Sequence, residues 1–338
     1  MNILVTGAAG YIGSILIPML IKKGHKVTAL DRFFFGDTLN NDKNLIKVKS
    51  DARNYDMTLL NGQDAVIDLV AISNDPAGEA FRDATYDINF ESRKRTAALA
   101  KQFGVKRYIL PSSCSIYGFQ KLNSIATEKS PTNPLTHYAK ANEMAEQAIL
   151  PLADNDFCVT VLRQATVFGY SPRMRFDLAI NGMTFGAWKN RVLPLMRDGE
   201  QWRPMIHVRD TADAMIMMLT KDIDKINGEI FNSGSSKNVY QLKSLAERVA
   251  SHVGSDVNLE WYGDKDIRSY NVSFEKIKQL GFSPKLVAED GVSEIIERLN
   301  SGKLDKTTKT ITLDWYNEIT NWHQLINDLA IDGIMIKK

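Results

Sequence analysis

The sequence has little of several features that would point to particular classes of protein. It contains only two cysteines, Cys114 and Cys158, so no disulfide framework is indicated. Its five histidines show no metal-ligand spacing, and we predict no metal. The formal net charge of +2 lacks the basic excess of nucleic-acid-binding proteins, and no apolar run is long enough to span a bilayer. Because the chain begins with a predicted core strand, we expect no cleaved signal and favour a cytoplasmic enzyme.

The length and the order of the elements indicate an α/β fold. A chain of 338 residues can form one large domain and a smaller one, and no internal repeat or low-complexity linker interrupts it. Strands and helices alternate through about residue 170, which is typical of a parallel sheet covered on both faces. We therefore predict a Rossmann-type doubly wound parallel sheet and a smaller mixed α/β C-terminal substrate domain.

The predicted domains are each made of two segments. Residues 1–169 plus about 205–235 form the dinucleotide-binding domain, and about 170–204 plus 236–338 form the substrate domain. The main elements expected outside the first strands are helices at 89–103, 138–150, 177–188, 211–219 and 241–253, and strands at 107–111, 205–210, 229–234 and 258–261. The amphipathic stretch 316–329 is expected to be a packing helix with no chemistry.

The strongest local signal lies in the first thirteen residues. The β-branched run Ile3–Val5 is followed by Gly7, Gly10 and Gly13 and then by a helical pattern that ends at Gly24. Gly7 and Gly10 allow the backbone to turn sharply and approach a pyrophosphate, whose charge then lies at the helix N-terminus. Gly13 lets the helix pack close to the strand. This order predicts a dinucleotide-binding site rather than an ordinary turn.

An acidic residue ends the second predicted strand. Asp31 follows the strand at 26–30, where its carboxylate can accept hydrogen bonds from the adenine-ribose hydroxyls. The same carboxylate would repel the 2′-phosphate of NADP, so NAD is the predicted cofactor. Arg32, the next residue, leaves NADP as the alternative.

The GxxGxxG spacing resembles the extended branch of the short-chain dehydrogenase/reductase superfamily, the NAD-dependent nucleotide-sugar epimerases and dehydratases. A second motif carries the same resemblance: Ser113 lies four residues before the pair Tyr117-Gly118, and Tyr138 begins a helix 25 residues beyond Ser113. The resemblance implies that Ser113 hydrogen-bonds the substrate oxygen. It also implies that Tyr138 transfers a proton while a hydride passes to or from nicotinamide.

One position departs from the family pattern. Family members carry a lysine four residues after the tyrosine, on the same helix face, whereas this chain has Asn142. Lys140 points nearly to the opposite side of the helix. A nearby cation lowers a tyrosine pKa by roughly one to two units. Asn142 can hydrogen-bond the nicotinamide ribose but brings no charge. We therefore expect slower, not abolished, proton transfer, and a catalytically impaired dinucleotide-binding protein is an alternative.

The resemblance also implies further contacts with the cofactor. Asp51 would meet the adenine amino group, and the turn at Val70 and Ala71 would pass beside the pyrophosphate. Asn89 would lie near the cofactor, or equally well would cap the helix predicted at 89–103. The full predicted cofactor set is Gly7, Gly10, Tyr11, Ile12, Gly13, Asp31, Arg32, Asp51, Ala52, Val70, Ala71, Asn89, Tyr138, Asn142, Gln164 and Val167.

Arginines are the main predicted contacts with the substrate. Arg203 and Arg268 match the family arginines that contact a nucleotide diphosphate, and a guanidinium pairs with phosphate oxygens bidentately. Solvated surface arginines are the alternative. The full predicted substrate set is Ser113, Ser115, Thr166, Arg175, Arg203 and Arg268.

The two residues after Ser113 limit the types of reaction that the site could catalyse. In the 4,6-dehydratases of the family the next two positions are an acid pair, but here they are Cys114 and Ser115, which disfavours dehydration. We predict an NAD-dependent oxidoreductase or epimerase that acts on a nucleotide-activated sugar at C4 through a keto intermediate. A dehydrogenase or ketoreductase with net cofactor turnover is the alternative. Since the family commonly pairs the helices predicted at 89–103 and 138–150 across a dimer, we also expect a homodimer.

Overall fold

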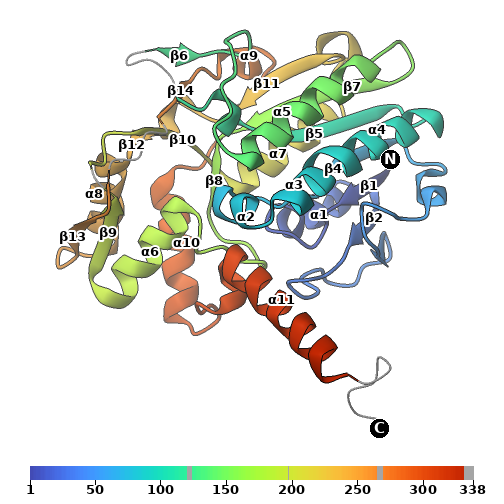
Figure 1. Cartoon of the computed structure of the whole chain (residues 1–338). Helices are drawn as coiled ribbons and strands as arrows, with labels where there is room; N and C mark the ends of the chain where they lie inside the picture. The colour runs from blue at the N-terminus through green and yellow to red at the C-terminus, as the bar shows by residue number, and fades with distance from the viewer. Residues whose placement is uncertain (120–123, 197, 265–268, 331–338) are drawn as a thin grey trace.

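The computed structural model describes residues 1–119, 124–196, 198–264 and 269–330. Its centre is a seven-stranded sheet in the order β11-β7-β5-β4-β1-β2-β3, and every neighbouring pair is parallel (Figure 1). The strands are β1 (Asn2–Thr6), β2 (Lys26–Asp31), β3 (Leu45–Lys49), β4 (Ala65–Asp68), β5 (Arg107–Ser113), β7 (Cys158–Gln164) and β11 (Glu229–Ser233). The strand order reverses between β1 and β4. Such a switch point is where open α/β sheets bind ligands, beyond the carboxyl ends of the strands.

The central strands are apolar on both faces because helices cover both. In β1, Ile3 and Val5 face one hydrophobic cluster and Leu4 faces the other. Helices α1 (Gly13–Lys22) and α7 (Val208–Met218) contribute to the first cluster. Helices α4 (Arg93–Gln102) and α5 (His137–Ile149) contribute to the second. The alternation along β1 therefore fixes which helices lie on which side.

A smaller part of the molecule is built from three short sheets and several helices, next to the carboxyl ends of the large sheet (Figure 1). Its strands are β8 (Thr166–Phe168), β10 (Trp202–His207) and β12 (Val239–Gln241) in one sheet, β9 (Val192–Met196) with β13 (Asn258–Tyr262), and β6 (Ile125–Ala126) with β14 (Asn271–Val272). Helices α6 (Ala179–Asn190), α8 (Leu242–Val253) and α10 (Ala288–Asn300) share one apolar cluster. Helix α9 (Glu275–Gln279) packs near β11.

Helix α11 (Thr312–Leu329) extends away from the rest of the molecule toward the C-terminus (Figure 1). Its first turns are held, since the Trp315 indole nitrogen donates to the Phe34 carbonyl at 2.7 Å. The described chain also contains short 3-10 helices, which are η1 (Met57–Leu60), η3 (Cys114–Tyr117), η4 (Leu150–Leu152), η5 (Ile223–Lys225), η6 (Ser236–Asn238) and η7 (Thr308–Thr310).

The largest differences between predicted and observed elements lie at two places. The helix predicted at 89–103 begins earlier: α2 (Asp75–Ala80) and α3 (Arg82–Tyr86) precede a π-helical segment, η2 (Asp87–Ser92), which runs into α4. The strand predicted at 205–210 ends at His207, whose Nδ1 accepts from the Arg209 backbone nitrogen at 3.2 Å and caps α7. A side-chain cap at a strand end converts the next residues into a helix start.

No helix within the described ranges combines the length and apolar character needed to cross a bilayer. Cys114 and Cys158 are both free and buried.

Candidate active site

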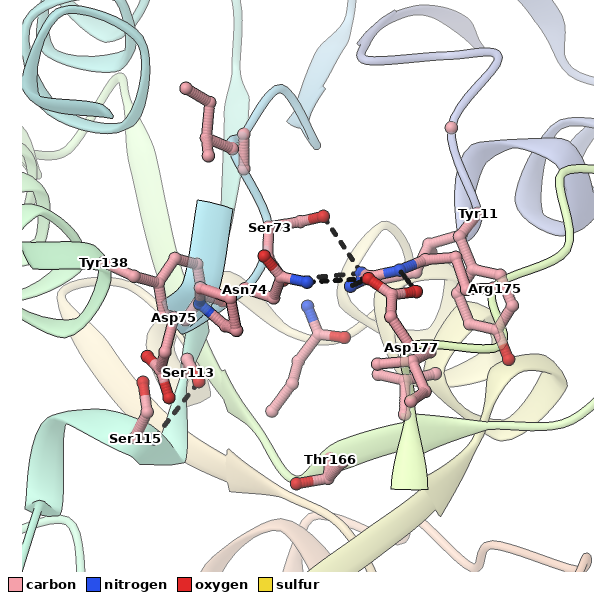
Figure 2. Close-up of a pocket in the computed structure, with 18 of the residues that line it drawn as sticks. Tyr11, Ser73, Asn74, Asp75, Ser113, Ser115, Tyr138, Thr166, Arg175 and Asp177 are labelled. Atoms are coloured by element: carbon pink, nitrogen blue, oxygen red, sulfur yellow. Dashed lines mark hydrogen bonds and ion pairs between the residues drawn. The ribbon is translucent and has the colours of Figure 1, made fainter. Parts of the chain in front are cut away.

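A cavity of about 740 Å³ lies at the carboxyl ends of the sheet strands, between the two parts of the molecule. This size is typical of sites for small molecules and cofactors. Most of the residues predicted from the sequence line it, namely Gly7, Gly10, Tyr11, Ile12, Gly13, Asp31, Arg32, Asp51, Ala52, Val70, Ala71, Ser113, Ser115, Tyr138, Gln164, Thr166, Val167, Arg175 and Arg203. Figure 2 shows a subset of the lining residues, with Tyr138, Ser113 and Ser115 on one side and Tyr11, Arg175 and Asp177 on the other.

The glycine turn between β1 and α1 leaves no room for larger side chains. Gly7 has φ of +61°, and a Cβ there would lie 2.7 Å from the Val70 backbone nitrogen. A Cβ on Gly13 would lie 2.2 Å from the Ala8 carbonyl oxygen. The first turn of α1 carries no acidic residue, so no side-chain charge opposes an anion at the positive end of the helix dipole. The turn therefore fits the pyrophosphate of a dinucleotide.

Asp31 lies at the end of β2 and lines the cavity. Its Oδ2 accepts from the Ala9 backbone nitrogen at 2.9 Å and its Oδ1 from the Phe33 nitrogen at 2.6 Å. Burial raises the pKa of this carboxyl group, and these backbone donors oppose the rise. Because each carboxylate oxygen has a further lone pair, ribose hydroxyls can still donate to it.

Arg32 is already engaged with other side chains. Its Nη1 lies 3.0 Å from the Asp51 Oδ2, and its guanidinium lies 4.2 Å from the centre of the Phe34 ring. Arg53 also pairs with Asp51, at 2.8 Å. A guanidinium held in this way does not offset the charge of Asp31, so the electrostatics of this corner favour NAD over NADP.

Among the described residues, four buried polar atoms of the cavity wall have no hydrogen-bond partner: the Ser115 hydroxyl oxygen, the Gln164 Oε1, and the Oε1 and Nε2 of Gln201. A buried polar group left without a partner costs about 1–3 kcal/mol. A polar ligand in the cavity would offer hydrogen-bond partners to these atoms. These orphan atoms, the glycine turn and Asp31 together fit a bound dinucleotide.

Ser113 and Tyr138 come together on one wall, as the sequence predicts. Ser113 ends β5, and its hydroxyl oxygen accepts from the Ser115 backbone nitrogen at 3.1 Å. Tyr138 lies in the first turn of α5, which begins after a cap in which Thr136 Oγ1 accepts from the Ala139 nitrogen at 3.1 Å. Burial raises the pKa of the Tyr138 phenol, while a hydrogen bond with Ser113 and the charge of Arg93 lower it. The phenol is therefore a proton donor at neutral pH that needs nearby positive charge to act as a base.

A polar cluster on the facing wall joins the two parts of the molecule. The Arg175 guanidinium binds Asp177 through Nε at 3.0 Å and Nη2 at 2.8 Å, and its Nη1 donates to the Ser73 hydroxyl at 2.9 Å. Asn74 Nδ2 donates to Asp177 at 2.6 Å (Figure 2). Burial opposes ionisation of Asp177, but the charge and hydrogen bonds of Arg175 outweigh it and lower its pKa to about 2. The loop after β4 is thus tied to the loop after β8.

Residues 3–234 match the family described as the NAD dependent epimerase/dehydratase family. The chain belongs to this family.

Members of the epimerase/dehydratase family with different reactions are similar to this chain to nearly the same degree. The Bacillus subtilis protein named uncharacterized UDP-glucose epimerase YtcB is 28% identical over 89% of this chain and 98% of its own length. A UDP-N-acetyl-alpha-D-glucosaminuronate decarboxylase of Bacillus cytotoxicus is 26% identical over 94% and 98%. The fold matches that of the UDP-glucose 4-epimerase of Thermotoga maritima, with a TM-score of 0.80 and 23% identity over 90% of this chain and 100% of the other. The family, its fold and its NAD-dependent chemistry are therefore shown, but the individual reaction is not.

Two described residues predicted from the family pattern, Asn89 and Asn142, do not line the cavity. Asn89 is buried, and its side-chain amide exchanges two hydrogen bonds with the backbone of Ile72, at 2.8 and 2.9 Å. It lies inside η2, so the alternative that it caps a helix is wrong. Asn142 is 1% exposed and lies one helical turn after Tyr138 on α5, outside the set of residues that line the cavity. Arg268 lies outside the described residues.

Several lining residues could not be found from the sequence. Arg93 lines the cavity, but the run 93–95 is uniformly basic and gives no sign of which member is buried. Asp75 follows the loop after β4 and lies near Tyr138 in Figure 2. Tyr316 of α11 also lines the cavity and contacts the rings of Phe34 and Phe35. Tyr316, the first residue of the stretch expected to be a packing helix, therefore also forms part of the cavity wall.

Proposed function

We propose that this family member is an NAD-dependent epimerase that inverts C4 of a nucleotide-activated sugar through a keto intermediate. The observation that carries the proposal is the meeting of Ser113 and Tyr138 on the wall of the cavity that the Gly7–Gly13 turn also lines. Oxidation or reduction of a sugar alcohol requires a cofactor site and, close to it, a group that transfers the hydroxyl proton.

The residues that would hold NAD follow from the geometry of the cavity. The amides of the glycine turn would bind the pyrophosphate, Asp31 the adenine ribose, and Asp51 the adenine. Gln164 would turn its unpaired Oε1 toward the nicotinamide half. When bound, NAD accepts a hydride from the sugar carbon and returns it.

The proton is handled by residues of the chain. Ser113 donates a hydrogen bond to the reacting sugar oxygen and keeps it beside Tyr138. In the oxidising direction the phenolate of Tyr138 takes the hydroxyl proton as the C–H electron pair leaves the carbon, which gives the ketone. In the reducing direction the phenol returns the proton to the oxygen as the carbon is reduced. Inversion of the carbon would require the hydride to return to the other face of the ketone.

The substrate diphosphate would be held by arginines. Arg203 lines the cavity and lies 5.2 Å from the centre of the Tyr270 ring, which orients its guanidinium. Residues 170–204 and 236–338 would form the nucleotide-sugar-binding domain. The named UDP-sugar relatives support a UDP-sugar as the substrate. A homodimer formed through α4 and α5 is part of the same proposal.

The test is to incubate the purified protein and NAD with a panel of UDP- and dTDP-hexoses and to separate the products chromatographically. We expect interconversion of two C4 epimers with no net gain in absorbance at 340 nm. Tyr138→Phe should lower kcat by about 10²–10⁴ while NAD binding is kept. Stoichiometric NADH would favour the dehydrogenase or ketoreductase alternative. If Tyr138→Phe matched the unaltered protein in every assay, a binding protein without catalysis would be the better description.

A further inference from the structure

Arg93 is a buried cation in the cavity wall. It is the first residue of α4, is 2% exposed, and reaches the cavity that Tyr138 also lines. Its Nε donates to the Val70 carbonyl at 2.9 Å and its Nη1 donates to Asn142 Oδ1 at 2.9 Å. Both acceptors are neutral, and Arg93 forms no ion pair with a carboxylate in the described part of the chain. A buried charge without a counter-charge lowers the stability of the fold, and a functional role would explain why it lies there.

A chain of hydrogen bonds connects this cation to the proton-transfer residue. Asn142 lies one helical turn after Tyr138 on α5, and its Nδ2 donates to the Tyr138 carbonyl at 2.9 Å. The same side chain accepts from Arg93 through Oδ1. Asn142 therefore holds the guanidinium beside the start of α5. An aspartate at position 142 would neutralise Arg93, whereas asparagine leaves its charge uncompensated.

The other charged groups near the phenol do not replace Arg93. Arg175 also acts on Tyr138, but Asp177 binds it bidentately and offsets its charge. Asp75 is negative and opposes formation of a phenolate. After the effects of burial and of the hydrogen bond with Ser113, the charge of Arg93 has the largest effect on the pKa of Tyr138.

We propose that Arg93 is a positioning residue for proton transfer, whose guanidinium, fixed by Asn142 and Val70, supplies the positive charge that stabilises the Tyr138 phenolate. The guanidinium contributes its positive charge and does not itself transfer a proton. This inference rests on the proposed function of Tyr138. It also replaces the expectation that Asn142 leaves the site without a cation: the charge comes from α4 instead of α5.

The test is a titration of the Tyr138 phenol in cofactor-free protein. Tyrosine labelled with ¹³C at Cζ gives one NMR signal for each ring, and the signal that disappears in Tyr138→Phe identifies Tyr138. In Arg93→Gln we expect the midpoint of its titration to rise by about one pH unit, since loss of a nearby opposite charge removes stabilisation of the phenolate. Arg93→Lys should restore part of the change. Lys94→Gln, which removes an exposed cation from the same helix, should leave the midpoint unchanged.

An unchanged midpoint in folded Arg93→Gln overturns the proposal. If Arg93→Gln does not fold, Asn142→Asp decides, because a carboxylate at 142 neutralises the guanidinium in place. The midpoint should then rise as well, and no rise overturns the proposal. In turnover, the pH profile of kcat should move with the midpoint while KM is unchanged. The titration uses neither sugar nor NAD, so it tests Arg93 independently of the substrate. If the midpoint shifts in Arg93→Gln but the unaltered protein turns over no nucleotide sugar, the proposed function is refuted and the proposed effect of Arg93 on Tyr138 is kept.

Discussion

Arg163 and Glu146 form a buried ion pair behind the wall that carries Ser113 and Tyr138. Arg163 lies on β7 and Glu146 on α5, two turns after Tyr138. The Arg163 Nη2 is 2.7 Å from the Glu146 Oε2, and the two side chains are only 6% and 4% exposed. The Ser112 hydroxyl also donates to Glu146. The pair therefore fixes the helix that bears the phenol to the strands that bear its partner.

Removing one member of this pair should cost much of the stability of the fold. Glu146→Ala leaves the Arg163 charge buried and uncompensated, which typically costs about 3–5 kcal/mol. Urea denaturation measures the free energy of unfolding. The control is Glu275→Ala, which breaks the exposed pair with Lys278 and should cost less than about 1 kcal/mol. Equal losses in the two variants would contradict the structural role of Glu146.

Gly13→Ala should abolish NAD binding. The added Cβ would lie 2.2 Å from the Ala8 carbonyl, so α1 must move away from the turn that receives the pyrophosphate. Calorimetric titration with NAD checks this. The control is Gly24→Ala at the other end of α1, where φ is +83° but no atom lies within 4 Å of the Cβ. That variant should lose only about 1 kcal/mol of stability from backbone strain and should bind NAD normally. Normal binding by Gly13→Ala would contradict the assignment of the turn.

Tyr316→Ala should weaken NAD binding by about tenfold, equivalent to about 1.4 kcal/mol. Tyr316 lines the cavity and packs on the rings of Phe34 and Phe35, in the segment that follows Asp31. Its loss would loosen the corner that receives the adenine ribose. Fluorescence titration with NAD measures the change. Leu325→Ala, on the same helix and 56% exposed, should have no effect. An equal effect of both variants would mean that α11 acts only through its general stability.

Stability in acid should depend on the Arg175–Asp177 pair. Against the effect of burial, Arg175 lowers the pKa of Asp177 from 3.8 to about 2. The unfolded chain therefore binds more protons between these values. The pair contributes its full stabilisation above about pH 4 and loses it as the pH falls toward 2, a change of about 2 kcal/mol. Urea denaturation at pH 6 and at pH 3 should show a smaller loss in Asp177→Asn than in the unaltered protein. An equal loss would contradict the pairing.

The cavity residues that could be predicted from the sequence are those whose positions follow from one strand, turn or helix start close by in the chain. The glycine turn needs only a strand before it and a helix after it, and Asp31 follows from the next strand end. Ser113 and Tyr138 meet because a strand end and a helix start on neighbouring segments face the same edge of the sheet. In each case the signal lies within one or two adjacent elements.

Sequence reasoning failed where the contact is long-range or depends on burial. The partner of Asn142 is Arg93, 49 residues earlier on another helix, and neither position signals the other. Tyr316 reaches the cavity from the far end of the chain. As one alternative, Asn89 was expected to cap the start of a helix, but η2 begins two residues before it, so Asn89 lies inside the helical segment.

The most direct test of the account is rapid mixing of the NAD-loaded protein with UDP-glucose, followed at 340 nm. We expect a transient rise in absorbance that returns to the baseline as the sugar epimers equilibrate, and a rise slowed by about 10²–10⁴ in Tyr138→Phe. No rise with UDP-glucose or with any other nucleotide sugar, in protein that calorimetry shows to bind NAD, would contradict it.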